Sequence, residues 1–121
     1  MIAMAQTVLI VDDHAAFRAS ARMLLECEGF DVVGEARDGE SALRAAAELH
    51  PQLVLLDVHL PDIDGFAVAE RLTASNGASP RVVLTSSRDL VEMAPLVERS
   101  GACGFVPKGE LSGDTLAAVL R

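Results

Sequence analysis

The sequence predicts an open α/β fold, in which helices cover both faces of a five-stranded parallel sheet. Short aliphatic runs alternate with segments of helical spacing along the chain, which is the pattern of parallel strands joined by crossover helices. Half of the 121 residues are hydrophobic but only 3% are aromatic. The core must therefore consist of Val, Leu, Ile and Ala, which are typical of buried parallel strands. The length fits one domain over residues 7–121, after a short disordered lead-in over residues 1–6.

Five aliphatic runs are expected to form the strands. The first, Thr7 to Val11, ends at an acidic pair, and the third, Leu53 to Leu56, is the most apolar. The second, Asp31 to Glu35, is more polar and is expected nearer an edge of the sheet. The fourth and fifth are Arg81 to Thr85 and Gly101 to Val106.

Four segments show regular helical spacing. Apolar residues share one face of the first, residues 14–28, and Gly29 is its candidate C-terminal stop. The second helix is expected to begin after Asp38 as N-cap and to be closed by Pro51. The others are Phe66 to Leu72 and a helix from the cap Ser112 to Leu120.

The fourth of the five helices, within Arg88 to Ser100, contains Pro95. If Asp89 capped this helix, the proline would interrupt it, at a cost of about 3 kcal/mol. The sequence therefore predicts a late start with Pro95 in the first turn, leaving a helix from Pro95 to Arg99. Residues Ser86 to Ala94 then form a loop beside the strand ends, and we expect this loop to be the most mobile part of the domain.

Charge and cysteine content restrict the class of protein. A formal net charge of −8 disfavours binding to nucleic acid or to an anionic membrane and is compatible with binding a cation. Cys27 and Cys103 form no CxxC pair and are expected to be buried free thiols in a reducing cytoplasm. The sequence contains no apolar run of the roughly 20 residues that span a bilayer, and its start does not resemble a signal peptide.

The residues whose side chains could react or bind a metal lie at the ends of strands. In open α/β sheets, sites form beyond the carboxyl ends of the strands, where Asp12, Asp13, Asp57, Thr85 and Lys108 are all expected. Clustered carboxylates repel one another unless a cation binds, and Mg²⁺ prefers such oxygen ligands. With the ion and Lys108 to neutralise a phosphoryl group, Asp57 is expected to be a nucleophile that forms an acyl phosphate.

Four motifs in this order resemble a known family. They are VLIVDDH at 8–14, LVLLDVHLPDIDG at 53–65, VVLTSS at 82–87 and GACGFVPK at 101–108. The chain resembles the receiver domains of bacterial two-component response regulators, most closely those that accompany LuxR-type DNA-binding domains (the NarL-FixJ group). The resemblance implies a flavodoxin-like, CheY-like doubly wound sheet with strand order 2-1-3-4-5.

The resemblance also implies a role for each site residue. Asp57 would be the phosphoacceptor. Asp13, Asp57 and the backbone carbonyl of His59 would ligate Mg²⁺ or Mn²⁺ directly, and Asp12 would act through water. Lys108 would contact the phosphoryl group.

Further implied roles concern the response to phosphorylation. Thr85 would move inward to bond the phosphoryl group, and Phe105 would be the coupled aromatic residue, here without the hydroxyl of a tyrosine. His59 and Ser87 would tune dephosphorylation. Asp62 and Asp64 are interpreted as turn residues only.

The implied function is that of a phosphorylation switch. A sensor histidine kinase or phosphotransfer protein would supply the phosphoryl group. The surface around the fourth helix and fifth strand would then control a downstream protein, with a phosphorylation-dependent dimer as one form of output. The domain itself would bind neither nucleic acid nor membrane, and it would catalyse only its own phosphotransfer and dephosphorylation.

Several alternatives remain open at this point. The chain is expected to stand alone, but it could be the receiver half of a longer DNA-binding regulator. It could be a pseudo-receiver that only binds partners, or a flavodoxin-like redox domain, although an acidic pair after the first strand is unfavourable for a flavin phosphate. Finally, His14 and His59 could complete a transition-metal cluster with the carboxylates, whereas His50 is expected at the surface.

Overall fold

The computed structural model describes residues 6–74, 79–87 and 93–120. Its strands are β1 (Thr7–Val11), β2 (Asp31–Ala36), β3 (Leu53–Asp57), β4 (Arg81–Ser86) and β5 (Gly104–Pro107). They form one sheet in which every neighbouring pair is parallel, in the order β2-β1-β3-β4-β5. The predicted topology is confirmed, with the polar strand β2 at an edge. The expected lead-in lies outside the described residues except for Gln6.

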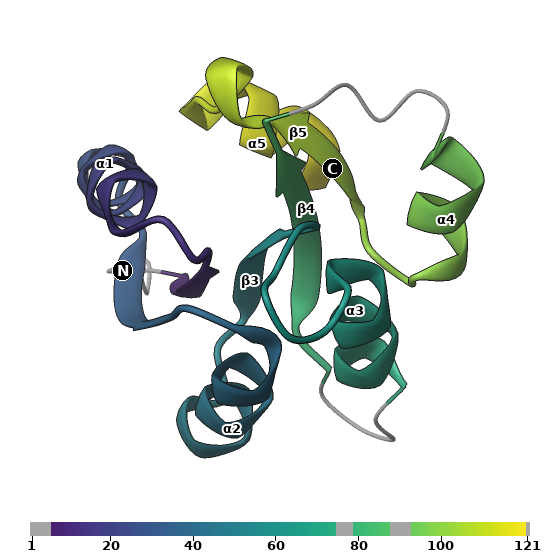
Figure 1. The fold of residues 1–121 in the computed structure, drawn as a ribbon. Helices are drawn as coiled ribbons and strands as arrows, with labels where there is room; N and C mark the ends of the chain where they lie inside the picture. Colours follow the sequence, from purple (N-terminus) through teal and green to yellow (C-terminus); the bar gives the residue numbers. More distant parts are fainter. Residues whose placement is uncertain (1–5, 75–78, 88–92, 121) are drawn as a thin grey trace.

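Five α-helices cover the two faces of this sheet. Helices α1 (Ala15–Cys27) and α5 (Gly113–Leu120) lie on one face, and α2 (Gly39–Leu49), α3 (Gly65–Thr73) and α4 (Ala94–Arg99) lie on the other (Figure 1). A short 3₁₀ helix, η2 (Lys108–Glu110), follows β5.

Two aliphatic cores lie between the sheet and the helices. Successive side chains of a strand point to opposite faces. In β1, Val8 and Ile10 therefore belong to the core under α1 and α5, and Leu9 and Val11 to the core under α2 and α3. All five residues of β3 are buried, which agrees with its place as the middle strand of the sheet. The predicted aliphatic core is confirmed, except that Phe66 is also buried in it.

The helix caps agree closely with the sequence prediction. The Asp38 carboxylate accepts the N–H of Ser41 at 2.8 Å and caps α2. Ser112 plays the same part for α5, where its hydroxyl accepts the N–H of Thr115. Gly29 adopts φ +92°, the left-handed conformation that commonly follows a helix end.

Asp62 and Asp64 do more than form a turn. Asp64 caps α3 by accepting the N–H of Phe66 at 2.6 Å. Asp62 reaches across to α2 and accepts the N–H groups of Gly39 at 2.7 Å and Glu40 at 3.0 Å. These bonds lower the pKa of the Asp62 carboxyl, the Gly39 bond most. The loop after β3 is thereby attached to the free N–H groups at the start of α2.

The late start of α4 is confirmed. The helix runs from Ala94 to Arg99 with Pro95 in its first turn, where the missing N–H of proline is tolerated. The preceding loop that the sequence predicts includes residues 88–92, which lie outside the described residues, so its mobility remains a prediction. The loop does not begin at Ser86, because this residue is the last of β4.

Two further sequence expectations are wrong. The fifth strand begins at Gly104 rather than Gly101, because Gly101 has φ +82° and residues 101–103 turn the chain from α4 into the sheet. Cys27 and Cys103 are free, as expected, but both are exposed rather than buried. Cys27 ends α1 on a face that points away from the core. Among the described helices, none has the length and hydropathy required to cross a bilayer.

Candidate phosphoacceptor and metal site

The predicted site residues converge at one edge of the sheet. Asp12 and Asp13 follow β1, and Asp57 ends β3. Thr85 is paired in register with Asp57, so the two side chains lie on the same face of adjacent strands. Lys108 begins η2 directly after β5. The parallel arrangement explains the convergence, because it places the carboxyl ends of all these strands together.

The backbone at Gly65 packs closely against the backbone of Asp57 and Val58. The Gly65 N–H donates to the carbonyl of Val58 at 2.8 Å. A Cβ at Gly65 would collide with the carbonyl oxygen of Asp57 and with the backbone of Val58. Glycine is therefore required where the loop after β3 returns to start α3.

Lys108 joins two of the carboxylates. Its Nζ atom lies 2.6 Å from Asp12 Oδ2 and 3.3 Å from Asp57 Oδ2. Both aspartates are buried, and the lysine side chain is only 14% exposed. Burial alone would lower the pKa of Lys108, but the neighbouring carboxylates, Asp12 first, hold it above its usual value. The lysine therefore stays charged at neutral pH.

Asp57 occupies an unfavourable environment for a charged carboxylate. Burial raises its pKa above the ordinary value, and the charge of Asp12 adds to this increase. The backbone N–H of His59, 3.1 Å from Asp57 Oδ1, and the ammonium of Lys108 act in the opposite direction without reversing it. A carboxyl group with a perturbed pKa at the edge of a sheet is a candidate functional group.

Four residues offer ligand atoms for a cation. Atoms of Asp12, Asp13, His14 and Asp57 lie within 4.8 Å of one another. Asp13 is partly exposed, so water can complete the coordination of an ion. Three carboxylates beside one ammonium leave excess negative charge, and hard oxygen ligands suit Mg²⁺ or Mn²⁺. The residues therefore fit the predicted metal. The role of the His59 carbonyl as a ligand remains a prediction.

The Thr85 hydroxyl has no hydrogen-bond partner among the described residues, although it is completely buried. A buried polar atom without a partner is rare and calls for an explanation. Phe105, opposite Leu84 in the neighbouring strand, is partly buried and packs against the core under α2 and α3. His59 and Ser87 are both exposed. Their kinetic roles remain predictions.

Phe17 and Arg18 escaped the sequence analysis of this site, and so did the contacts of His14. His14 was foreseen near the edge, but not that its Nδ1 lies 3.0 Å from Asp13 Oδ1 and 3.1 Å from Asp12 Oδ1. The ring of Phe17 lies under Lys108, with its centroid 4.6 Å from Nζ. Arg18 donates from Nη1 to the carbonyl of Asp12 at 2.6 Å. Phe17 and Arg18 lie in the first turns of α1, soon after the acidic pair, and this position in the sequence could have identified them as residues of the site.

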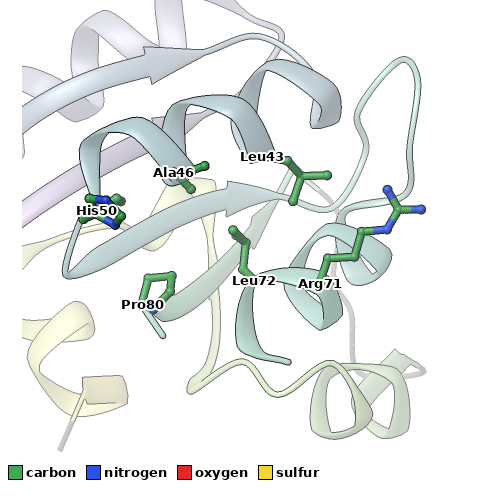
Figure 2. Close-up of a pocket in the computed structure, with 8 residues that line it drawn as sticks. Leu43, Ala46, His50, Arg71, Leu72 and Pro80 are labelled. Carbon is green, nitrogen blue, oxygen red and sulfur yellow. The ribbon is translucent and has the colours of Figure 1, made fainter. Parts of the chain in front are cut away.

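A hollow with a volume of about 420 Å³ lies between α2 and α3, and none of its described lining residues belongs to the site above. Leu43 and Ala46 of α2 and Leu72 of α3 line it, with His50 at one end and Arg71 at the other (Figure 2). His50 is exposed at the C-terminal end of α2, as expected. The described lining residues include no carboxylate, so this hollow resembles a gap between helices more than a catalytic pocket.

Comparison with known proteins identifies the family. The family model of the response regulator receiver domain matches residues 8–121. The chain belongs to this family. It is 41% identical over 120 residues to the transcriptional regulatory protein PdtaR of Mycobacterium tuberculosis, covering 97% of this chain and 56% of the relative. It is 40% identical over 103 residues to the response regulator GacA of Pseudomonas aeruginosa, covering 84% and 48%.

Solved receiver domains share the fold. A signal receiver domain assigned to the response regulator NarL of Mycobacterium tuberculosis superposes with a TM-score of 0.84 at 31% identity, over 98% of each chain. A LuxR-family two-component response regulator from Aurantimonas sp. SI85-9A1 gives a TM-score of 0.84 at 28% identity, over 97% of this chain and 86% of that one. The resemblance to receiver domains and the CheY-like fold are thus confirmed. The receiver domain spans about half the length of the curated relatives named above.

Proposed function

We propose that this receiver domain accepts a phosphoryl group on Asp57 in a Mg²⁺-dependent reaction, and that phosphorylation changes the surface around α4 and β5. One observation carries the proposal. The buried Asp57 carboxylate lies between Lys108 and the acidic pair, on the same face of the sheet as a buried Thr85 hydroxyl that has no partner among the described residues. A phosphoryl group on Asp57 would supply acceptors for both Lys108 and Thr85.

The chemistry follows from the order of groups at this edge. A carboxylate oxygen of Asp57 attacks the phosphorus of a phosphohistidine, so that a P–O bond forms while the P–N bond breaks. The electron pair of the broken bond stays on the donor imidazole, which takes up a proton. Lys108 faces the new negative charge, and a divalent ion held by Asp12, Asp13 and Asp57 would neutralise the phosphoryl oxygens.

The response to phosphorylation would start at Thr85. A hydrogen bond from its hydroxyl to the phosphoryl group draws the end of β4 towards the site. Phe105 lies opposite Leu84, the residue before Thr85, and it packs against the same core as Val97 of α4 and Met93, which precedes this helix. A shift of β4 would therefore reach α4 through Phe105 and this core. The result is a population shift between two packings, only one of which bonds the phosphoryl group.

The first experiment tests the acceptor. The protein is incubated with acetyl phosphate and Mg²⁺, and the intact mass is measured. We expect one added phosphoryl group in the wild type and in the control Asp64→Asn, but none in Asp57→Asn. Stable labelling of Asp57→Asn would refute the assignment of this residue.

The second experiment tests the metal. We expect excess chelator to abolish labelling, because the clustered carboxylates retain excess negative charge without a cation. Asp13→Ala should weaken Mg²⁺ binding more than Asp12→Ala, because Asp13 is the more solvent-accessible of the pair and Asp12 is already paired with Lys108. Equal labelling with and without chelator would remove the metal from the mechanism.

The proposed partners are a sensor histidine kinase or phosphotransfer protein and a downstream protein, in the cytoplasm. No turnover of a separate substrate is proposed. A second candidate is the receiver half of a DNA-binding regulator, which is supported by relatives named as transcriptional regulators and about twice as long. Immunoblotting of source cells with an antibody against this domain distinguishes a protein of 12.7 kDa from one of about twice that mass.

A further inference from the structure

We propose that Asp62 is a positioning residue of the phosphoacceptor site, because it attaches the loop after β3 to the N-terminal end of α2. This loop, residues 58–64, follows Asp57 directly, and its His59 N–H donates to the Asp57 carboxylate. The part of the inference that concerns Mg²⁺ rests on the proposed function, whereas the part that concerns the position of the loop does not.

The first argument is that Asp62 makes a two-point attachment. Its Oδ1 accepts the N–H of Gly39 at 2.7 Å, and its Oδ2 accepts the N–H of Glu40 at 3.0 Å. Oδ1 also accepts the N–H of Ile63, the next residue of the loop, at 2.8 Å. Hydrogen bonds to an ionised carboxylate are stronger than bonds between neutral groups, and the positive end of the α2 dipole adds to the attraction. The carboxylate therefore has a defined orientation on α2.

The second argument is that α2 has a cap of its own. Asp38 and Ser41 form a capping box, in which each side chain bonds the backbone N–H of the other residue. Asp62 binds the two N–H groups in between from outside the helix, although like charges at one helix end repel each other. Its position is therefore explained better by what it does for the loop than by what it does for the helix.

The third argument is the close packing between the loop and α2. A Cβ at Gly39 would lie 3.0 Å from the Cβ of Ile63 and 3.0 Å from Cγ2 of Val68 in α3. Ile63 is half-buried and packs against the core under α2 and α3. The loop therefore has little room to move towards α2, and the bonds of Asp62 oppose movement away from it.

The fourth argument is that the loop has few other attachments. At its start, Val58 donates its N–H to the carbonyl of Thr85 at 2.9 Å, and its own carbonyl accepts the N–H of Gly65 at 2.8 Å. Between these points, Asp62 provides the only hydrogen bonds from residues 59–63 to a helix, within the part of the chain that the structure describes. Loss of the Asp62 carboxylate would leave this segment without such a bond.

The segment that Asp62 holds carries both backbone groups of His59. The N–H lies 3.1 Å from Asp57 Oδ1. The carbonyl is the proposed metal ligand. Groups that orient the ligands of a metal contribute to its affinity although they do not contact the ion. Asp62 thus acts on the site through the backbone of His59.

Amide hydrogen exchange at His59, measured without divalent ions, tests the position of the loop. We expect this amide to exchange at least about fivefold faster in Asp62→Ala than in the wild type. Asp62→Asn should give an intermediate rate, because its side chain offers one acceptor oxygen instead of two. Asp38→Ala is the matched control, since it weakens the same helix end without removing a contact of the loop.

The control separates positioning from a general loss of stability. Both alanine variants should lower the Tm by about 4 °C, because each removes a carboxylate that binds free N–H groups of α2. In Asp38→Ala, however, the His59 amide should exchange within about twofold of the wild-type rate.

Titration with Mg²⁺ tests the consequence for the site. We expect calorimetry to show Mg²⁺ binding weakened by about fivefold or more in Asp62→Ala and by less than about twofold in Asp38→Ala. With acetyl phosphate, Asp62→Ala should need more Mg²⁺ for half-maximal labelling of Asp57. At saturating Mg²⁺ its maximal rate should return to within about twofold of the wild type, because the bound ion then holds the loop.

Three results would overturn the proposal. They are unchanged His59 exchange in Asp62→Ala, equal changes in Asp62→Ala and Asp38→Ala, and faster His59 exchange with unaltered Mg²⁺ binding. If the wild type binds no Mg²⁺ or is not labelled, the proposed function fails. The exchange rate of the His59 amide, which requires neither, then decides by itself whether Asp62 positions the loop.

Discussion

At the scale of single residues, the site holds groups that the resting structure does not use fully. Thr85 keeps a buried hydroxyl without a partner among the described residues, and Asp57 keeps a buried carboxylate that Lys108 neutralises only in part. Both arrangements reduce stability. Such features are expected where function, rather than folding, determines the residue.

Thr85 is predicted to matter for the response and not for the fold. Thr85→Val keeps the size of the side chain and removes the hydroxyl, so we expect the free energy of unfolding to rise by about 1 kcal/mol. Thr85→Ala should leave the thermal stability nearly unchanged. In both variants, acetyl phosphate should no longer change the NMR shifts around Phe105. Thr85→Ser, which retains the hydroxyl, is the control, and an unaltered response in Thr85→Ala would remove the residue from the mechanism.

Arg18 is predicted to position the acidic pair. Its guanidinium bonds the carbonyl of Asp12 and pairs with Glu35, which lies on β2. Arg18→Ala should weaken Mg²⁺ binding by about tenfold, because groups that orient metal ligands affect affinity on this scale. Calorimetric titration with Mg²⁺ measures the change. Arg22→Ala is the matched control, since Arg22 also binds Glu35 but contacts the carbonyl of Val32 instead of Asp12. Equal losses in the two variants would contradict a positioning role.

At the scale of elements, α4 differs from the other helices. It has six residues, and none of them is buried. In contrast, α1 has thirteen residues and buries Ala21 and Leu25. A short helix with little buried apolar surface opens at low cost. We therefore expect α4 to be the element that a shift of β4 and Phe105 displaces most readily.

Hydrogen exchange measures this difference. We expect the amides of Leu96 to Arg99 to exchange at least about tenfold faster than those at the centre of α1, relative to their intrinsic rates. Pro95→Ala should slow the exchange in α4, because it allows the helix to extend towards its N-terminus. Protection equal to that of α1 in the wild type would show that α4 is not the mobile element.

At the scale of the whole molecule, the ionised carboxylate of Asp57 opposes folding. Burial raises the pKa of Asp57 in the folded state above its value in the unfolded chain. Its contribution to stability is therefore fully present below the unfolded pKa, about 3.9, and is lost as the pH rises through the folded pKa. The ionised Asp57 should thus destabilise the domain at neutral pH.

Asp57→Asn removes this charge. We expect the variant to be more stable than the wild type at pH 7 by about 1 kcal/mol, or roughly 4 °C in Tm, and equal to it near pH 3. Lys108 retains Asp12 as its partner in the variant. Denaturant unfolding across this pH range provides the comparison, without added divalent ions. A less stable variant at pH 7 would mean that the Lys108–Asp57 ion pair outweighs the effect of burial.

Features that depend on local patterns in the chain could be predicted from the sequence. The sequence by itself determined the order of the elements, the strands apart from the start of β5, the caps Asp38 and Ser112, and the late start of α4, because these depend on periodicity and on local backbone chemistry. It also indicated that Asp12, Asp13, Asp57, Thr85 and Lys108 converge, because parallel strands share one carboxyl edge.

Only the tertiary structure decided the contacts between segments distant in the chain. The attachment of Asp62 to α2 and the position of Phe17 under Lys108 join different elements. Local patterns do not encode such pairs, because they depend on how helices and loops pack against the sheet. The exposure of Cys27 was decided in the same way, since the rotation of α1 on the sheet determines which of its side chains the core buries.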